Sequence, residues 1–190
     1  MWIGLTGGIG SGKTTIANQL RERGMAVYDT DQAAKAVIMT PPVREQLEAL
    51  FGSEVFQDGY YHTDLVAATV FARPDLLQAL NRIVHPAVVQ DLRQTYPHQG
   101  ETLFIESAIL YESGMDALCD RVVAVIAPKT LRIERTMARD GKSREQVVAR
   151  IKSQMSNCQL RHRVDYVVEN NGKQSVEELT RKLLKRYKLL

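Results

Sequence analysis

A glycine-rich stretch near the amino end has the residue types and spacing of a phosphate-binding loop. Residues 7–14 read GGIGSGKT and fit the pattern GxxxxGK[ST]. Glycine allows backbone angles that side chains forbid, so successive N–H groups can converge on one anion at the positive end of a following helix. Lys13 adds an ammonium group for the β- and γ-phosphates, and Thr14 adds a hydroxyl ligand for Mg²⁺.

The predicted phosphate contacts are the glycines of this loop and the residues that open the next helix. An ordinary glycine-rich turn would explain the glycines, but not a lysine and a threonine in this register. The motif indicates a nucleotide with Mg²⁺, although it does not by itself distinguish a kinase from a switch or a motor. The predicted set is Gly8, Gly10, Ser11, Gly12, Lys13, Thr14 and Thr15, with Thr14 as the metal ligand.

Two aspartates follow the second apolar run of the chain. Asp29 and Asp31 come where a strand is expected to end, and in open α/β sheets ligands collect at that edge. A hydroxyl group that attacks a γ-phosphoryl group needs an acceptor for its proton, and a positioned carboxylate suits that task. We predict Asp31 as this base. The alternative is that one aspartate caps the helix that begins near Gln32.

Short apolar runs alternate with amphipathic segments along the chain, which is typical of βαβ units. Runs that are apolar throughout favour strands covered on both faces. The expected fold class is therefore α/β, with a five-stranded parallel sheet flanked by helices. The predicted strands are residues 2–5, 26–28, 102–105, 121–126 and 164–168.

Two stretches between these strands are longer than a simple crossover requires. Residues 32–99 read as helix throughout, punctuated by proline and glycine pairs that include His85-Pro86, and they predict a helical subdomain. Residues 139–163 form a second excursion, in which Ser143 and Gln146 have the pattern of a capping box. Ser175 and Glu178 repeat that pattern before a terminal helix.

Composition excludes several classes of protein. The chain has 190 residues, 44% of them hydrophobic and 25% charged, which is ordinary for a soluble domain. No apolar run approaches the roughly twenty residues that cross a bilayer, so we expect no membrane partner. A net charge of +3 is too small to argue for nucleic acid. Cys119 and Cys158 lack metal-ligand spacing, which favours reduced thiols in a cytoplasmic protein.

An ordered set of motifs resembles bacterial dephospho-coenzyme A kinases over nearly the whole chain. The motifs are IGLTGGIGSGKTT, DTD at 29–31, NRIVHPAV at 81–88, AILYESG at 108–114, RTMARDGKSREQVVARIKSQMS, and VDYVVENNG. The resemblance implies transfer of the ATP γ-phosphoryl group to the ribose 3′-hydroxyl of dephospho-coenzyme A. It also implies a P-loop kinase core, a substrate subdomain and a lid, which we assign to 1–31, 100–138 and 164–190 (core), 32–99 (substrate subdomain) and 139–163 (lid).

The resemblance also suggests roles for two arginines and a histidine. Arg139 and Arg150 match the lid pattern, and a planar guanidinium suits the charge that spreads over a γ-phosphate; the alternative is a solvated helix surface. We predict Arg139 as catalytic and Arg150 as an ATP contact. Asp29 and His85 are candidate substrate contacts, although His85 could simply serve a helix junction.

Several positions keep two interpretations. Glu106 follows an apolar strand and could order a water on Mg²⁺, or could be a solvated residue at a strand end. Ala108 stands where the family typically has proline, which loosens the loop but removes no catalytic group. Asn170 precedes an Asn-Gly pair that could approach adenine or could form an ordinary turn.

Two other functions compete with the leading one. The first is another P-loop kinase that acts on a nucleoside, a nucleotide or a shikimate-like hydroxyl acceptor. The second is a nucleotide-gated interaction protein with no small acceptor. A guanine-reading NKxD segment is not visible in the sequence, which weakens a GTPase switch.

Overall fold

The computed structural model describes residues 1–97 and 100–190. For residues 71 and 72 it describes the backbone only. It divides into two compact units. The first, here called the core unit, comprises Met1–Asp29 and Gly100–Leu190. The second, here called the helical unit, comprises Thr30–Gln99.

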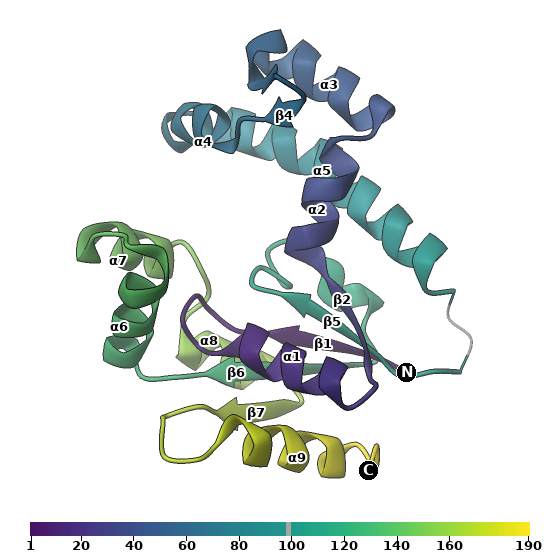
Figure 1. Ribbon diagram of the computed structural model, residues 1–190, viewed down its shortest axis with the longest axis vertical. Coiled ribbons are helices and arrows are strands. Elements are labelled where there is room, and N and C mark those ends of the chain that lie inside the picture. Colours follow the sequence, from purple (N-terminus) through teal and green to yellow (C-terminus); the bar gives the residue numbers. More distant parts are fainter. Residues whose placement is uncertain (98–99) are drawn as a thin grey trace. The chain divides into compact units, whose positions relative to one another are not determined.

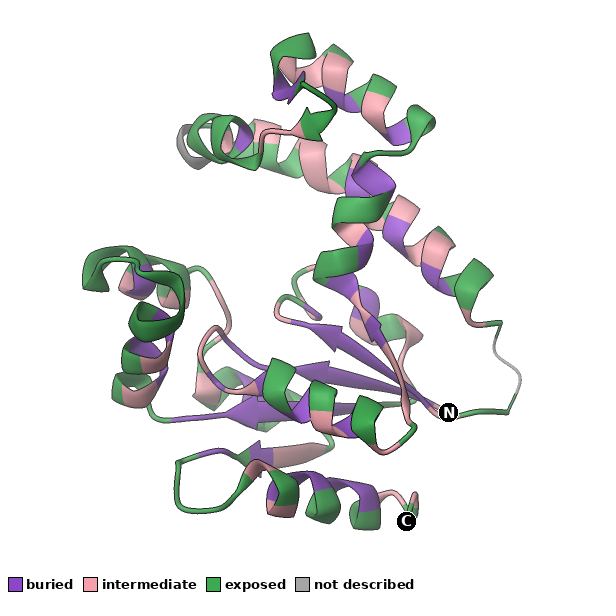
Figure 2. Ribbon diagram, in the orientation of Figure 1, coloured by how far each residue is buried: buried purple, intermediate pink, exposed green. Residues whose placement is uncertain are grey.

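The core unit is built on a parallel sheet of five strands in the order β2-β5-β1-β6-β7 (Figure 1). This confirms the predicted fold class and the five strands; the bounds of β6 agree, and the ends of the other four differ by at most two residues. The three central strands, β5, β1 and β6, are purple along most of their length in Figure 2 because both of their faces are covered, whereas the edge strands β2 and β7 are partly exposed. Their bounds are β1 Trp2–Thr6, β2 Ala26–Asp29, β5 Leu103–Ser107, β6 Arg121–Ile126 and β7 Tyr166–Glu169.

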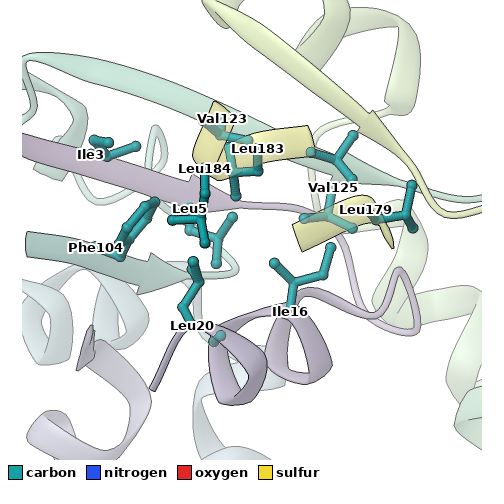
Figure 3. Close-up of a cluster of buried hydrophobic side chains, with 12 residues drawn as sticks. Ile3, Leu5, Ile16, Leu20, Phe104, Val123, Val125, Leu179, Leu183 and Leu184 are labelled. Atoms are coloured by element: carbon teal, nitrogen blue, oxygen red, sulfur yellow. The ribbon is translucent and has the colours of Figure 1, made fainter. Parts of the chain in front are cut away.

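Alternate residues of β6 face the two layers of helices. Val123 and Val125 join the cluster formed with α1 (Lys13–Glu22) and α9 (Val176–Arg186). Ala124 and Ile126 join a second cluster with Leu160 of α8 (Asn157–Arg163). Figure 3 shows the first cluster, in which Ile16, Leu20, Leu179, Leu183 and Leu184 lie against the strands. Burying each such side chain contributes about 1.5–3 kcal/mol, so this cluster holds α1 firmly on the sheet.

Two further helices of the core unit follow β6. They are α6 (Lys129–Asp140) and α7 (Arg144–Lys152), and the 3₁₀ helix η2 (Met115–Leu118) precedes β6. The predicted capping box is confirmed at α7, where Ser143 and Gln146 bond reciprocally. At α9 the Ser175 side chain accepts from the Glu178 N–H, while the Glu178 carboxylate pairs with Lys182 at 3.0 Å.

Four α-helices are described within residues 30–97 of the helical unit, and the expectation of helix throughout 32–99 is wrong at residues 53–61. A 3₁₀ turn, η1, leads there into a two-stranded hairpin. Asp58 and Gly59 form its turn with φ of 52° and 79°, and such an Asp-Gly pair favours a hairpin. The elements are α2 Thr30–Ile38, α3 Pro41–Phe51, η1 Ser53–Val55, β3 Phe56–Gln57, β4 Tyr60–Tyr61, α4 Thr63–Ala72 and α5 Pro74–Thr95.

The His85-Pro86 pair does not interrupt helix α5, contrary to the sequence-based expectation. Pro86 lies inside the helix, where it lacks the N–H that would bond to the Arg82 carbonyl. The buried stripe of Val84, Val88 and Leu92 continues on both sides of it, so packing within the unit outweighs that loss. Across residues 1–97 and 100–190, no helix has both the length and the apolarity needed to span a bilayer.

Candidate active site

The glycine-rich loop connects β1 to α1 and is closely packed from behind. Gly10 and Gly12 have φ of 76° and 89°, in the left-handed region that favours glycine. A Cβ atom on Gly10 would lie 2.3 Å from the Arg132 carbonyl oxygen, and one on Gly12 would lie 2.1 Å from the Asn170 Nδ2. Both positions therefore need glycine for conformation and for space.

Lys13 and Thr14 converge on one carboxylate. The Lys13 ammonium lies 2.8 Å from Glu106 Oε1, and the Thr14 hydroxyl donates to the same oxygen at 2.7 Å. Glu106 is 3% exposed, and its Oε2 is buried with no hydrogen-bond partner, with Arg21 Nη2 at 3.6 Å. The interpretation of Glu106 as a solvated residue is therefore wrong, because the carboxylate is an internal partner of the loop.

The site lies at the carboxyl edge of the sheet, as the position of the loop requires. Glu106 lies in register with Leu5 on one side and with Asp29 on the other. Asp29, the last residue of β2, is half-buried. Because parallel strands end together, Asp29 and Glu106 bring two carboxylates to this edge beside the loop.

Asp31 and His85 belong to the helical unit. Helix α2 begins at Thr30, earlier than expected, so Asp31 lies inside its first turn, where a carboxylate interacts favourably with the helix dipole. Asp31 is exposed. His85 is half-buried in α5, and burial lowers the pKa of its imidazole, which favours the neutral ring.

Arg139 and Arg150 gather around an aspartate. The Arg139 guanidinium bonds to both Asp140 oxygens, at 2.6 and 2.9 Å. Hydrogen bonding to Arg139 lowers the pKa of Asp140, and the positive charges of Arg139, Lys142 and Arg150 lower it further. Both arginines are exposed. Within the part of the chain that the structure describes, neither forms a hydrogen bond or an ion pair with residues 7–15.

Two other side chains, which the motif analysis did not assign to the site, hold the loop at Ile9. Arg132 Nε of α6 donates to the Ile9 carbonyl at 2.8 Å, and the Ile9 N–H donates to Gln154 Oε1 at 2.8 Å. Both backbone groups of one loop residue are thus bonded to side chains more than a hundred positions away. The one sequence signal was the i, i+4 pairing of Arg132 with Thr136, which share the buried face of α6.

Asn170 holds the other end of the loop. It follows β7 directly, is 4% exposed, and donates from Nδ2 to the Ser11 carbonyl at 2.9 Å. Arg135 in turn bonds to Asn170 at 3.3 and 3.4 Å. The sequence analysis named Asn170 for an approach to adenine or for an ordinary turn and did not predict this bond to the loop.

The oxygen atoms beside Lys13 fit a hard cation that shares its ligands with phosphate. Thr14 offers a hydroxyl, and Glu106 offers a carboxylate with one buried oxygen that accepts no hydrogen bond. Mg²⁺ takes few protein ligands and completes its octahedron with phosphate oxygens and water. The described residues contain no group of three or more His, Cys, Asp or Glu side chains that could hold a metal ion.

Comparisons with known proteins identify the family. The family model described as dephospho-CoA kinase matches residues 1–176. A protein of Porphyromonas gingivalis named dephospho-CoA kinase is 44% identical over 154 residues, 80% of this chain and 76% of that protein.

Two solved structures have a similar fold. One from Thermus thermophilus, TT1252, has a TM-score of 0.87 at 36% identity and covers 100% of this chain and 97% of its own. A dephospho-CoA kinase from Campylobacter jejuni shares the fold, with a TM-score of 0.68 at 20% identity over 98% and 96% of the two chains. The chain therefore belongs to the dephospho-CoA kinase family.

Proposed function

We propose that this protein transfers the γ-phosphoryl group of ATP to the 3′-hydroxyl of the ribose of dephospho-coenzyme A, giving coenzyme A and ADP. Membership of the family supports the reaction and the use of ATP. The observation in the structure that carries the proposal is the glycine-rich loop whose Lys13 and Thr14 meet Glu106 at the carboxyl edge of the sheet. This edge is where an α/β fold binds ligands.

The loop and Lys13 bind the polyphosphate in this proposal. The backbone amides of residues 10–15 and the positive end of α1 attract the phosphate oxygens. Before ATP arrives, Glu106 holds the Lys13 ammonium in place at 2.8 Å. Little side-chain entropy then remains to be lost when Lys13 turns to the β- and γ-phosphates.

Thr14 and Glu106 are the residues that would hold Mg²⁺. When bound, the ion neutralises charge on the β- and γ-phosphate oxygens. The Thr14 hydroxyl supplies a direct oxygen ligand, and Glu106 faces the same place with its carboxylate. Glu106 Oε2 supports this assignment, because it is buried without a hydrogen bond and has only the Arg21 guanidinium at 3.6 Å, whereas a buried carboxylate oxygen usually accepts a hydrogen bond.

Asp31 is our candidate for the base that accepts the proton of the ribose hydroxyl. It comes two residues after Asp29, and two residues of chain span at most about 7 Å, which keeps it near the end of β2. Asp29 and His85 are proposed to contact dephospho-coenzyme A, and His85 suits a hydrogen bond from a neutral ring.

Arg139 and Arg150 are proposed to meet the γ-phosphoryl group when the segment 139–163 closes over ATP as a lid. Both are exposed, Arg139 is paired with Asp140, and the charges of both lower the pKa of that carboxyl, so they are available to an anion that outcompetes one carboxylate. A paired guanidinium contact stabilises the charge that develops during transfer. Closure also excludes water, which would otherwise compete as the acceptor.

An acceptor panel tests the proposed reaction. ADP release is measured with a coupled assay in the presence of dephospho-coenzyme A, nucleoside monophosphates or shikimate, with EDTA as the metal control. We expect dephospho-coenzyme A to be the only acceptor in the panel that supports turnover, and we expect EDTA to abolish that turnover. Turnover restricted to another acceptor, or hydrolysis that no acceptor stimulates, would overturn the proposal.

We also propose that the reaction takes place in the cytoplasm, which the two free cysteines, Cys119 and Cys158, support.

A further inference from the structure

An arginine is buried behind the phosphate-binding loop. Arg132 is 3% exposed. Its Nε donates to the Ile9 carbonyl at 2.8 Å, and its Nη1 makes a long bond of 3.4 Å to Asn157 Oδ1. Its Nη2 is buried and has no hydrogen-bond partner. A guanidinium group has five N–H donors, so this side chain is far from satisfied.

The charge of Arg132 has no carboxylate to balance it in the described part of the chain. Burial alone lowers the pKa of the group, and no acidic neighbour acts on it. Arginine nevertheless stays protonated at neutral pH. A buried cation without a negative charge beside it is costly for the folded state. We therefore expect the balancing negative charge to arrive with a ligand.

The position of Arg132 indicates which ligand that is. A Cβ atom on Gly8 would lie 2.1 Å from Arg132 Nη2, so the unpartnered nitrogen lies directly against the loop backbone. The Arg132 carbonyl similarly backs Gly10. The loop whose amides are expected to receive the phosphates therefore rests on a fixed positive charge.

We propose that Arg132 is a positioning residue that holds the loop at Ile9 and whose buried charge is balanced by the polyphosphate of the bound nucleotide. Arg132 acts through the loop backbone, in addition to Lys13, which meets the phosphates themselves. The inference rests on the proposed use of ATP but not on the identity of the acceptor. It implies that Arg132 stabilises the nucleotide complex relative to the free protein. This stabilisation increases with the number of phosphates on the nucleotide.

The test is a binding series with Arg132→Met, which keeps the apolar stem and removes the charge. Dissociation constants for AMP, ADP and ATP are measured by calorimetry. Since a charged hydrogen-bonding group contributes about tenfold or more in affinity, we expect ATP and ADP to lose about tenfold and AMP less than about twofold. Arg132→Lys, which retains the charge, should recover part of the loss.

Two further measurements separate this role from a purely structural one. The Tm of the nucleotide-free protein should stay the same or rise in Arg132→Met, because an unbalanced buried charge has been removed. Arg161→Met is the matched control: it removes an equal charge from an exposed pair with Glu169 and should leave all three dissociation constants unchanged.

Three results would overturn the inference: equal losses for AMP and ATP, no loss for ATP, or no recovery in Arg132→Lys. These results are independent of the acceptor panel. If the protein phosphorylated a different alcohol, Arg132→Met would still lose more affinity for ATP and ADP than for AMP. The failure of this inference and the failure of the proposed reaction can therefore be told apart.

Discussion

Replacing Glu106 by Gln should destabilise the core unit strongly, although the side chain keeps its shape. Lys13 and Glu106 are an ion pair at 2.8 Å whose side chains are 9% and 3% exposed. Removing one partner of a buried pair costs about 3–5 kcal/mol, because the other charge stays buried alone. Gln retains an oxygen for Lys13 and Thr14, so we expect the lower end, about 3 kcal/mol, or a fall in Tm of about 6–12 °C.

Tryptophan fluorescence is a suitable assay for this loss. Trp2 is the one tryptophan of the chain and is buried in β1, so its emission follows unfolding of the core unit. Glu169→Gln is the matched control, since it breaks an exposed pair with Arg161 and should cost under about 1 kcal/mol.

A double variant tests whether the loss of stability comes from leaving the Lys13 charge unpaired. Lys13→Met with Glu106→Gln removes both charges, so most of the stability lost in Glu106→Gln alone should return. The reasoning is refuted if Glu106→Gln unfolds at the same temperature as Glu169→Gln, because Glu106 would then carry no buried charge pair.

Three more predictions concern catalysis and reactivity. Lys13→Ala should weaken ATP binding and lower turnover, as read from titration calorimetry and the coupled assay, and unchanged affinity would remove Lys13 from the phosphate site. Asp31→Asn should keep nucleotide binding but lower kcat by roughly 10²-fold or more in the same assay, whereas a normal rate would exclude Asp31 as the base. Burial raises the pKa of the Cys119 thiol to about 12, so at pH 8 only about one thiol in ten thousand is ionised there. A thiol reagent should then modify exposed Cys158 and spare Cys119 in the folded protein, and equal rates would contradict that burial.

The sheet and the loop were predictable because their signals are local. Short apolar runs such as β6 form strands that are buried on both faces, and the loop motif needs only consecutive residues. The hairpin at 56–61 was missed because its strands are two residues long, too short for any periodicity. Its one local signal was the Asp58-Gly59 pair.

The supports of the loop were not predictable in the same way. Helix α6 carries three arginines that look alike in the sequence: Arg132, Arg135 and Arg139. The resemblance drew attention to Arg139, which is exposed, whereas Arg132 is buried against Ile9 from 123 positions away. Only the packing of α6 beside the loop distinguishes them, and that packing depends on tertiary contacts that a sequence pattern does not encode.

The double attachment of Ile9 limits how the chain can bend during turnover. Arg132 precedes α7 and Gln154 follows it, and both are fastened to the same residue. If the proposed lid, residues 139–163, moves without releasing either bond, the part of it that can move is residues 139–153, between the two anchors. Helix α8 lies beyond the second anchor and packs against β6 through Leu160, so this part of the proposed lid is attached to the sheet.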